Sequence, residues 1–421
     1  MDPVQAPAFV RSRLSIMMFL EFFLWGAWYV SMGPYLFANE MGDVVGWAYS
    51  VGPIAAIVSP FFLGMIADRF FATERVLGVM QILGGVALCA APWAASQSAN
   101  LFIVAILLHM LCYMPTLGLT NTLAFHNMTD SEKQFPLIRV WGTIGWIVAN
   151  VTISQAGWDT SANMFYLAGG AALAMGVFSF TLPHTPPPAK GQAFSARDAL
   201  GLDALVLLKN RSFSVFVLCS FLICIPLAAY YALAGQFVGE TGFEKITQTM
   251  SFGQMSEIAF MLVMPLFFAR LGVKWMLLVG MAAWVARYGL FAGAAGDSIK
   301  WMVLTGVILH GICYDFFFVT GQIYVDNAST AKIRGQAQGF LVLITQGLGM
   351  FIGAQIIGKL VAMNTTGEGD LAVIDWKQVW IVPCIFAGVI MVIFFLFFRD
   401  PGRKPRIEAP AVDEMDERTT M

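Results

Sequence analysis

The chain has 421 residues, of which 58% are hydrophobic and 12% are charged, and its formal net charge is −2. Soluble globular proteins carry about 25% charged residues, so this composition excludes an ordinary soluble fold. A transmembrane helix needs about 20 apolar residues, and apolar runs of this length recur along the whole sequence. The strands of a membrane barrel would instead show about ten residues of alternating hydrophobicity. We therefore expect an all-α membrane protein.

The apolar runs predict twelve transmembrane helices and leave no room for a large soluble domain. Their ranges are 14–37, 46–67, 76–96, 100–124, 138–157, 161–182, 212–238, 249–270, 275–296, 299–325, 336–362 and 378–398. The first span is expected to be a retained signal anchor, because no small-residue cleavage site accompanies it. Eighteen Lys and Arg residues fall in segments assigned to the cytoplasmic side, against four on the other side. The positive-inside rule therefore predicts that both termini are cytoplasmic.

Two pairs of similar segments, about two hundred residues apart, indicate an internal repeat. LLHMLCYMP, which contains His109, resembles ILHGICYDF, which contains His310. AWYVSMG, from Ala27, resembles AYYALAG, from Ala229. Two copies of one six-helix module in the same order are typical of transporters whose substrate site lies between the halves, near the bilayer midplane.

The repeat and the polar breaks predict how the chain is divided. We expect an N-terminal six-helix bundle (1–182), a cytoplasmic linker (183–211), a C-terminal six-helix bundle (212–398) and a disordered cytoplasmic tail (399–421). Prolines end the sixth helix and open the linker. The linker segment 194–208 mixes apolar and charged residues and is a candidate amphipathic helix at the inner interface.

The six cysteines all fall within predicted spans, where we expect them to pack as small apolar residues and not to form disulfides or bind a metal. The sequence contains no G-x-S-x-G, H-E-x-x-H or paired catalytic aspartate motif. We therefore do not expect an enzyme.

Charged residues inside the spans are functional candidates, because each costs about 2.5–3.5 kcal/mol at a helix centre. They are Glu21, Arg139, Glu257, Arg287 and Asp315. Asp315 and Glu257 are the best candidates for proton binding, since a medium of low dielectric constant favours the protonated form of a carboxyl group. A static buried ion pair is the alternative for each acid. Arg287 either neutralises Asp315 or takes part in coupling, and Glu21 is either structural or functional.

Polar and aromatic residues recur at helical spacing on three spans that we expect to face inward. Aromatic faces beside amide, hydroxyl, guanidinium and carboxylate groups suit a neutral polyhydroxylated or heterocyclic ligand. Helix packing alone is the alternative, but convergence on three helices favours a cavity. The residues are Arg139, Thr143 and Trp146 on the fifth span, Gln254 and Glu257 on the eighth, and His310 and Tyr314 on the tenth.

The loop after the second span reads GMIADRFFATER and contains Gly64, Asp68, Arg69 and Arg75. A glycine here allows close helix packing, and an aspartate can cap or pair across the inner face. An ordinary charged turn is the alternative. In this loop the chain resembles the major facilitator superfamily, whose members carry G-x-x-x-D-R and a further basic residue at this place. The resemblance implies twelve transmembrane helices in two parallel six-helix repeats.

Further segments, from the first span to the eleventh, are similar to the nucleoside:proton symporters, the bacterial nucleoside permeases. They include FLEFFLWGAW (19–28), FPLIRVWGTIGW (135–146), GQMSEI (253–258) and HGICYDFFFVTG (310–321). The resemblance implies proton-coupled nucleoside import by alternating access across the bacterial inner membrane, with no cofactor besides the coupling proton. It also implies that Asp315 couples the proton and that the nucleoside site is lined by Arg139, Thr143, Trp146, Gln254, Glu257 and Tyr314.

Three positions differ from the corresponding residues of a bacterial nucleoside permease of this family. His310 stands where that permease has a tyrosine, while Ala228 and Tyr231 stand where it has a site-lining glutamine and asparagine. We include His310 and Tyr231 among the expected substrate-binding residues. The missing amides leave the substrate open, because buried polar groups decide selectivity steeply. The alternatives are a proton-linked carrier of another small polar solute, such as a sugar, and a non-transporting receptor on a carrier fold.

The partners that we expect are this small solute and the lipid bilayer. We expect no nucleic acid and no metal, and we expect the monomer to be the functional unit.

Overall fold

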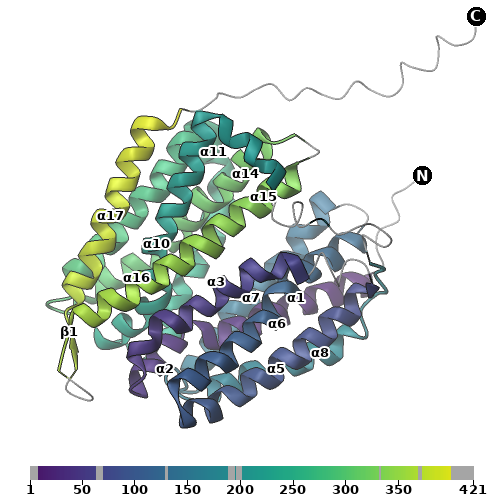
Figure 1. Ribbon diagram of the computed structural model, residues 1–421, viewed down its shortest axis with the longest axis horizontal. Helices are drawn as coiled ribbons and strands as arrows, with labels where there is room; N and C mark the ends of the chain where they lie inside the picture. The colour runs from purple at the N-terminus through teal and green to yellow at the C-terminus, as the bar shows by residue number, and fades with distance from the viewer. Residues whose placement is uncertain are drawn as a thin grey trace, which may run out of the picture.

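The structure is a computed structural model that describes residues 8–62, 70–128, 131–187, 195, 202–330, 333–367 and 372–399. These residues are mostly helical. The helices gather into two groups, one formed by the purple and blue first half of the chain and one by the green and yellow second half (Figure 1). In the described ranges the strands are limited to β1 (Thr365–Thr366) and β2 (Val373–Ile374), which pair antiparallel.

The first half contains six helical passages. The side chain of Ser98 caps one of them by accepting a hydrogen bond from the backbone N–H of Leu101. The first passage packs against the fifth and sixth, and the third packs against the fourth and sixth. The helices are α1 (Ala8–Tyr29) with α2 (Met32–Ala38), then α3 (Val45–Phe62), α5 (Thr73–Gln97), α6 (Ala99–His126), α7 (Ser131–Gln155) and α8 (Asn163–Ser179).

The second half begins at Asn210, whose side chain accepts hydrogen bonds from the backbone N–H groups of Ser212 and Phe213. Two of its passages contain a π-helical turn between α-helical parts. The elements are α10 (Arg211–Glu240), α11 (Ile246–Ala294), α12 (Lys300–Ile308), α13 (His310–Cys313), the π-turn η4 (Tyr314–Val319), α14 (Thr320–Ala328), α15 (Arg334–Val342), the π-turn η5 (Leu343–Gly349), α16 (Met350–Met363) and α17 (Trp376–Phe397).

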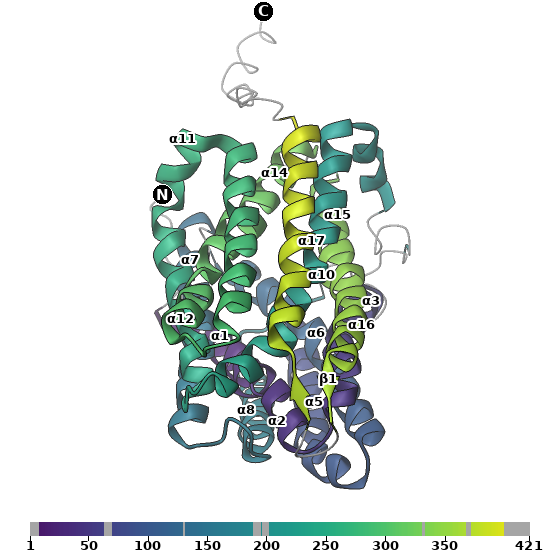
Figure 2. The same ribbon diagram turned by 90° about the vertical axis from the view of Figure 1, so that its left-hand side faces the viewer.

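Helix α11 is two passages joined by a sharp turn. Gly272 has φ 67° and ψ −180°, a conformation that glycine adopts without the steric penalty of a side chain. Figure 2 shows the two limbs of α11 meeting at one end of the molecule. The break at Gly272 falls between the predicted spans 249–270 and 275–296, and it confirms that they are two separate passages.

Within the described residues, nine helices are long and apolar enough to cross a membrane, and one of them is α11. Because α11 bends at Gly272, it supplies two passages. Helix α3 ends where a described range ends, and α8 has 17 residues. With these two included, the helices account for the twelve predicted spans.

The two halves meet along two equivalent pairs of helices. Helix α3, the second passage, contacts η5 and α16 of the eleventh, and α7, the fifth, contacts α11 of the eighth. In the internal repeat the second passage is equivalent to the eighth, and the fifth to the eleventh. The two pairs of contacts are therefore equivalent, as expected for two copies of one module. Helix α2 also contacts α10.

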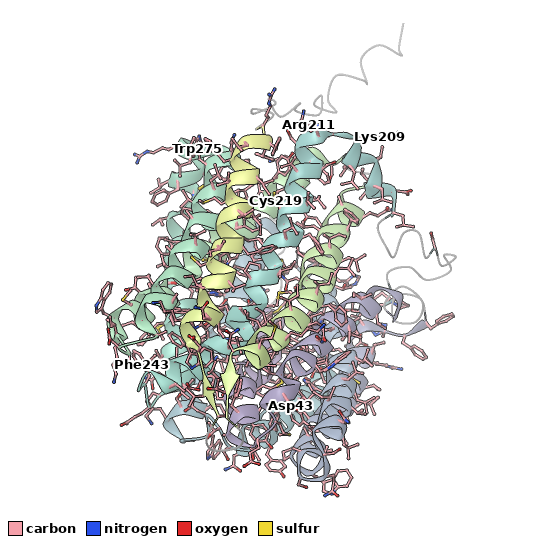
Figure 3. All side chains as sticks on the ribbon, turned by 60° about the vertical axis from the view of Figure 1, so that its left-hand side comes forward. Asp43, Lys209, Arg211, Cys219, Phe243 and Trp275 are labelled. Carbon is pink, nitrogen blue, oxygen red and sulfur yellow. The ribbon has the colours of Figure 1, made fainter. Side chains whose placement is uncertain are left out.

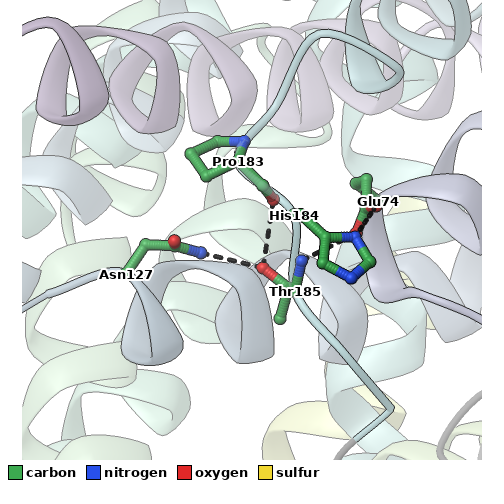
Figure 4. Close-up of polar contacts among 5 residues, drawn as sticks. All are labelled: Glu74, Asn127, Pro183, His184 and Thr185. Carbon is green, nitrogen blue, oxygen red and sulfur yellow. Dashed lines mark hydrogen bonds and ion pairs between the residues drawn. The ribbon is translucent and has the colours of Figure 1, made fainter.

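The segment that follows α8 is fixed to the beginning of α5 and the end of α6. Glu74 pairs with His184 at 2.9 Å and accepts a hydrogen bond from the backbone N–H of Thr185 at 3.0 Å, while Asn127 donates to the Thr185 hydroxyl at 2.8 Å (Figure 4). The backbone N–H of Thr73 also donates to the carbonyl of Thr185. These contacts attach the start of the predicted linker to the N-terminal bundle.

Two predictions for this region fall largely outside the described residues. Of the candidate interfacial helix 194–208, the structure describes residue 195 and the 3₁₀ helix η3 (Leu202–Lys209). Of the predicted tail 399–421, it describes Arg399.

Candidate substrate site

The contact between α11 and α13 places Glu257 beside His310. A Cβ atom at Gly311 would lie 2.6 Å from the backbone nitrogen of Glu257, so only glycine allows the two helices to approach this closely. Ser256 strengthens the contact, because its hydroxyl donates to the carbonyl of Ile308 and accepts from the N–H of Gly311. As a result, Nε2 of His310 lies 3.9 Å from Oε2 of Glu257.

Arg139 lies on α7 of the other half. Its guanidinium lies 4.0 Å from the centre of the Phe22 ring, a cation–π contact that orients the side chain. Arg139 interacts electrostatically with Glu257, and Tyr314 interacts with both. A cation from the N-terminal half and an acid from the C-terminal half therefore influence each other across the boundary where α7 packs against α11.

Aromatic rings continue from the N-terminal half into the C-terminal half. Trp146 on α7 lies edge-on to Trp25 on α1, with ring centres 5.3 Å apart. Trp25 contacts Tyr29 at 5.5 Å, and Tyr29 contacts Tyr231 on α10 at 5.9 Å. We call Trp25, Tyr29, Trp146 and Tyr231 the aromatic wall. It spans the boundary between the two halves.

The aromatic wall follows the internal repeat. Tyr29 and Tyr231 occupy the same place in the similar segments AWYVSMG and AYYALAG, and they touch each other. A second equivalent position differs between the halves. Nδ1 of His109 pairs with the carbonyl of Gly84 at 3.0 Å, whereas His310 stacks on Tyr230 and faces the acid on α11.

Asp315 lies in the π-turn η4 and is completely buried. Neither of its carboxyl oxygens has a hydrogen-bond partner, although Glu257 is near enough to interact with it electrostatically. Isolated π-turns within α-helices frequently mark functional sites. Asp315 is therefore a buried acid without a partner in the described part of the chain.

Arg287 does not neutralise Asp315, which was one of the two possibilities left open by the sequence. Its Nε donates to the carbonyl of Gly306 at 3.0 Å, and its guanidinium lies 4.0 Å from the centre of the Tyr230 ring. Its Nη1 and Nη2 atoms have no hydrogen-bond partner among the described residues. The hairpin between the ninth and tenth passages brings Arg287 near the tenth, but its side chain contacts Tyr230 instead of the acid.

Glu21 is completely buried in the N-terminal bundle and does not extend toward the membrane surface. Its Oε2 accepts a hydrogen bond from Gln81 at 2.7 Å, and its Oε1 lies 2.5 Å from the hydroxyl oxygen of Thr116. Both neighbours are neutral side chains.

The structure brings most of the predicted site residues together. Arg139 lies near enough to Glu257 and Tyr314 to interact with them electrostatically, Glu257 lies 3.9 Å from His310, and ring contacts link Trp146 to Tyr231 through the aromatic wall. Thr143 and Gln254 are half-buried and lie one turn from Arg139 and Glu257 on the same helix faces.

The predicted loop motif is described only in part. Gly64, Asp68 and Arg69 lie outside the described residues, and Arg75 is exposed in the first turn of α5.

Sequence reasoning missed Trp25, Tyr29 and Tyr230. Signals were available for two of them: Trp25 lies in the segment FLEFFLWGAW, and the repeat pairs Tyr29 with Tyr231.

Comparisons with known proteins identify the family. The family model described as nucleoside H⁺ symporter matches residues 9–403. The chain belongs to this family. It is 39% identical to the putative nucleoside transporter YegT of Escherichia coli strain K12, over 96% of this chain and 97% of that protein. It is 33% identical to the nucleoside permease NupG of the same organism, over 92% of this chain and 95% of the permease.

A solved structure of the nucleoside transporter NupG matches with a TM-score of 0.82 and 32% identity, covering 93% of this chain and 99% of that chain. The predicted family and the predicted twelve-helix fold are confirmed. The chain is a membrane transporter and not an enzyme.

Proposed function

We propose that this nucleoside H⁺ symporter imports nucleosides together with protons by alternating access, using the site between its halves. One observation carries the proposal: Arg139 and Glu257, from opposite halves, lie near enough to interact electrostatically, and an aromatic wall crosses the same boundary. A ligand held between them contacts both halves, so its binding is coupled to their relative movement.

The chemistry of this site suits a nucleoside. Aromatic faces stack on a flat base, and the carboxylate of Glu257 and the amide of Gln254 can hydrogen-bond to ribose hydroxyls or base edges. Nε1 of Trp25, Nε1 of Trp146 and Nδ1 of His310 have no hydrogen-bond partner in the described structure. A buried polar group without a partner costs about 1–3 kcal/mol, and acceptors on a ligand would offset that cost.

One end of the boundary between the halves is closed by hydrogen bonds. The carboxylate of Asp159 accepts from the backbone N–H of Thr247 at 2.8 Å and from the hydroxyl of Ser154 at 2.8 Å. Gln248 N–H donates to the Ser154 hydroxyl at 3.0 Å. These N–H groups belong to the first turn of α11, where backbone donors lack partners within the helix. The N-terminal half thus caps a helix of the C-terminal half.

We call these residues, with Gln155 and Lys245, the outer seal, because we propose that they lie on the periplasmic side. The proposal follows from charge. Lys209 and Arg211 lie at the opposite end of the molecule from Asp43 (Figure 3), and Asp43 precedes α3 at the sealed end. Basic residues favour the cytoplasmic side. Both termini are then cytoplasmic in the bacterial inner membrane.

We also propose how the chain is divided and what its working unit is. We propose bundles at 1–182 and 212–398, a linker at 183–211 and a cytoplasmic tail at 399–421. We also propose that the monomer is the working unit, because one chain supplies both sides of the site.

Asp315 is the group that we propose for proton coupling. Protonation from the outer side would favour loading of substrate, and deprotonation toward the cytoplasm would accompany its release. A membrane potential contributes about 2.3 kcal/mol per charge per 100 mV, so one coupled proton can concentrate a neutral solute more than tenfold.

The test of function is uptake by cells that express the protein, using labelled nucleosides, free bases and sugars, with and without a protonophore. We expect nucleosides to accumulate, the external medium to become more alkaline on their addition, and the protonophore to abolish accumulation. Accumulation of sugars in preference to nucleosides would identify the alternative solute class. Binding of a nucleoside without any uptake would indicate a receptor and refute the proposal.

A further inference from the structure

Besides Asp315, Glu21 is also completely buried, and the proposed mechanism does not use it. It lies on α1 with no exposed surface, and both of its carboxyl oxygens have neighbours. Gln81 on α5 donates to Oε2, and Thr116 on α6 contacts Oε1. The same Gln81 nitrogen lies 3.1 Å from the Thr116 hydroxyl oxygen. The three side chains form a closed cluster in which only Glu21 is ionisable.

The titratable and charged groups around Glu21 do not supply a cation to its carboxyl group. On α6, the Tyr113 hydroxyl donates to the backbone carbonyl of Glu21, and His109 pairs with a backbone carbonyl instead. On α7, the guanidinium of Arg139 lies over Phe22. Helix α8 also packs against α1, and its titratable side chain, Tyr166, is exposed. An ionised carboxylate buried without a cation is strongly unfavourable, so the surroundings select the neutral acid.

The oxygen–oxygen contacts point the same way. The hydroxyl oxygen of Thr116 lies 2.5 Å from Oε1 of Glu21 and 2.6 Å from the backbone carbonyl of Tyr113. Each contact has the length of an O–H···O hydrogen bond, but a threonine hydroxyl supplies one hydrogen. A proton on Glu21 would satisfy both contacts at once, because Glu21 would then donate to the Thr116 hydroxyl and Thr116 would donate to the backbone carbonyl of Tyr113.

The cluster is connected to the aromatic wall. Glu21 and Trp25 lie one turn apart on α1, on the same face of the helix. Tyr113, which is held by the backbone of Glu21, contacts Trp25 at 5.4 Å, and Trp25 contacts Trp146 at 5.3 Å. A change in the position of Glu21 would therefore move the rings that face the proposed substrate.

We propose that Glu21 is a proton-binding site that stays protonated throughout the transport cycle, and that the neutral acid is a positioning residue for the aromatic wall. Its proton is not the transported one. The second part rests on the proposed function, because it assigns the wall to the substrate site. The first part concerns only the carboxyl group and can be tested without substrate.

The protonation state is tested by infrared spectroscopy of the purified full-length protein in lipid. We expect wild-type protein to show the C=O band of a protonated carboxylic acid from about pH 5 to about pH 9, and Glu21→Gln to lack it. Thr116→Val, which removes the hydrogen-bond acceptor, should shift the same band to higher frequency. This shift identifies the band even if Glu21→Gln does not fold. A carboxylate band that responds to Thr116→Val, or loss of the acid band within this pH range, would overturn the proposal.

The positioning role is tested by uptake kinetics with two substitutions at the same position. Glu21→Gln, an uncharged isostere that can donate to Thr116 and accept from Gln81, should retain KM, kcat and proton-driven accumulation. Glu21→Ala should raise KM by about fivefold or more, which corresponds to the loss of about one hydrogen bond, with a smaller change in kcat. An effect on stability alone would lower the amount of folded protein and leave KM unchanged, which would refute positioning.

Two further outcomes are distinguishable. Loss of accumulation in Glu21→Gln with intact binding would show that the Glu21 proton is exchanged during transport, and would overturn the inference. Failure of the wild-type protein to transport nucleosides would reject the proposed function, while the infrared result would still decide the protonation state.

Discussion

The two halves of the molecule each bury an acid completely, but they treat it differently. In the N-terminal half, Glu21 is held by Gln81 and Thr116. In the C-terminal half, neither oxygen of Asp315 has a hydrogen-bond partner among the described residues. Equal burial is therefore combined with different surroundings. Loss of a proton from Glu21 would disrupt a hydrogen-bonded cluster, whereas Asp315 can gain or lose one without breaking a bond that the structure shows.

The largest effect is expected from removing the acid without a partner. Asp315→Asn keeps the shape of the side chain but cannot release a proton, so accumulation of nucleoside in energised cells should fall to the level seen with a protonophore. Binding should remain. Accumulation is measured with labelled nucleoside, and binding by isothermal titration calorimetry on the purified variant. Normal accumulation by Asp315→Asn would show that Asp315 does not carry the coupled proton.

A large effect on binding is expected at the acid that faces the other half. Glu257 interacts with Arg139 across the boundary and lies 3.9 Å from His310. Because a hydrogen bond to a charged group contributes about 1.5–3 kcal/mol, Glu257→Gln should weaken nucleoside binding by about 10- to 100-fold. Titration calorimetry measures the change, and Glu244→Gln, outside the site, serves as the matched control. Unchanged affinity would exclude Glu257 from the substrate site.

The outer seal tests how the halves are joined. Asp159→Ala removes the hydrogen bonds that Thr247 donates across the boundary from its backbone N–H and its hydroxyl, each contributing about 1 kcal/mol, so the outward-open population should rise about tenfold or more. The readout is the distance between spin labels on the outer ends of α5 and α17, in protein whose native cysteines are replaced. Asp159→Asn retains one acceptor oxygen and should give an intermediate result. Identical distance distributions in all three proteins would contradict the assignment of the seal.

The smallest effect is expected from the repeat-related histidines, which provide their own control. His310→Phe keeps a ring that can stack on Tyr230 but removes the ring nitrogens beside Glu257, so KM should rise by about fivefold, as expected for the loss of about one hydrogen bond to the substrate. His109→Phe removes a hydrogen bond to Gly84 and should lower thermal stability with little change in KM. Equal effects of the two substitutions on KM would mean that the halves do not differ at this position.

Much of the fold could be predicted from the sequence, because each passage through the bilayer must be long, apolar and helical. The repeat could also be read from the sequence, but the contact between its equivalent tyrosines, Tyr29 and Tyr231, at the boundary came from the structure. The π-turn at Asp315 could not be predicted, because its extra residue per turn shifts the buried face by only one position, and a span as apolar as YDFFFV does not reveal such a shift.

The candidate site was predictable where spacing on one helix or the family resemblance decides it, as for Arg139 and Trp146. Contacts between helices were harder. Glu21 is held by residues from α5 and α6, and Arg287 lies against Tyr230 instead of Asp315. Such partners depend on side-chain rotamers and on how closely the helices pack, and neither leaves a periodic signal in the sequence.

The most direct test of the central claim counts protons moved per nucleoside in proteoliposomes, with a pH-sensitive dye inside the vesicles and labelled nucleoside outside. Wild type, Glu21→Gln and Asp315→Asn are compared at equal protein content. We expect Glu21→Gln to move protons and nucleoside in the wild-type ratio, and Asp315→Asn to exchange nucleoside without moving protons. Proton movement that persists in Asp315→Asn, or disappears in Glu21→Gln, would contradict the assignment of the coupled proton to the C-terminal half.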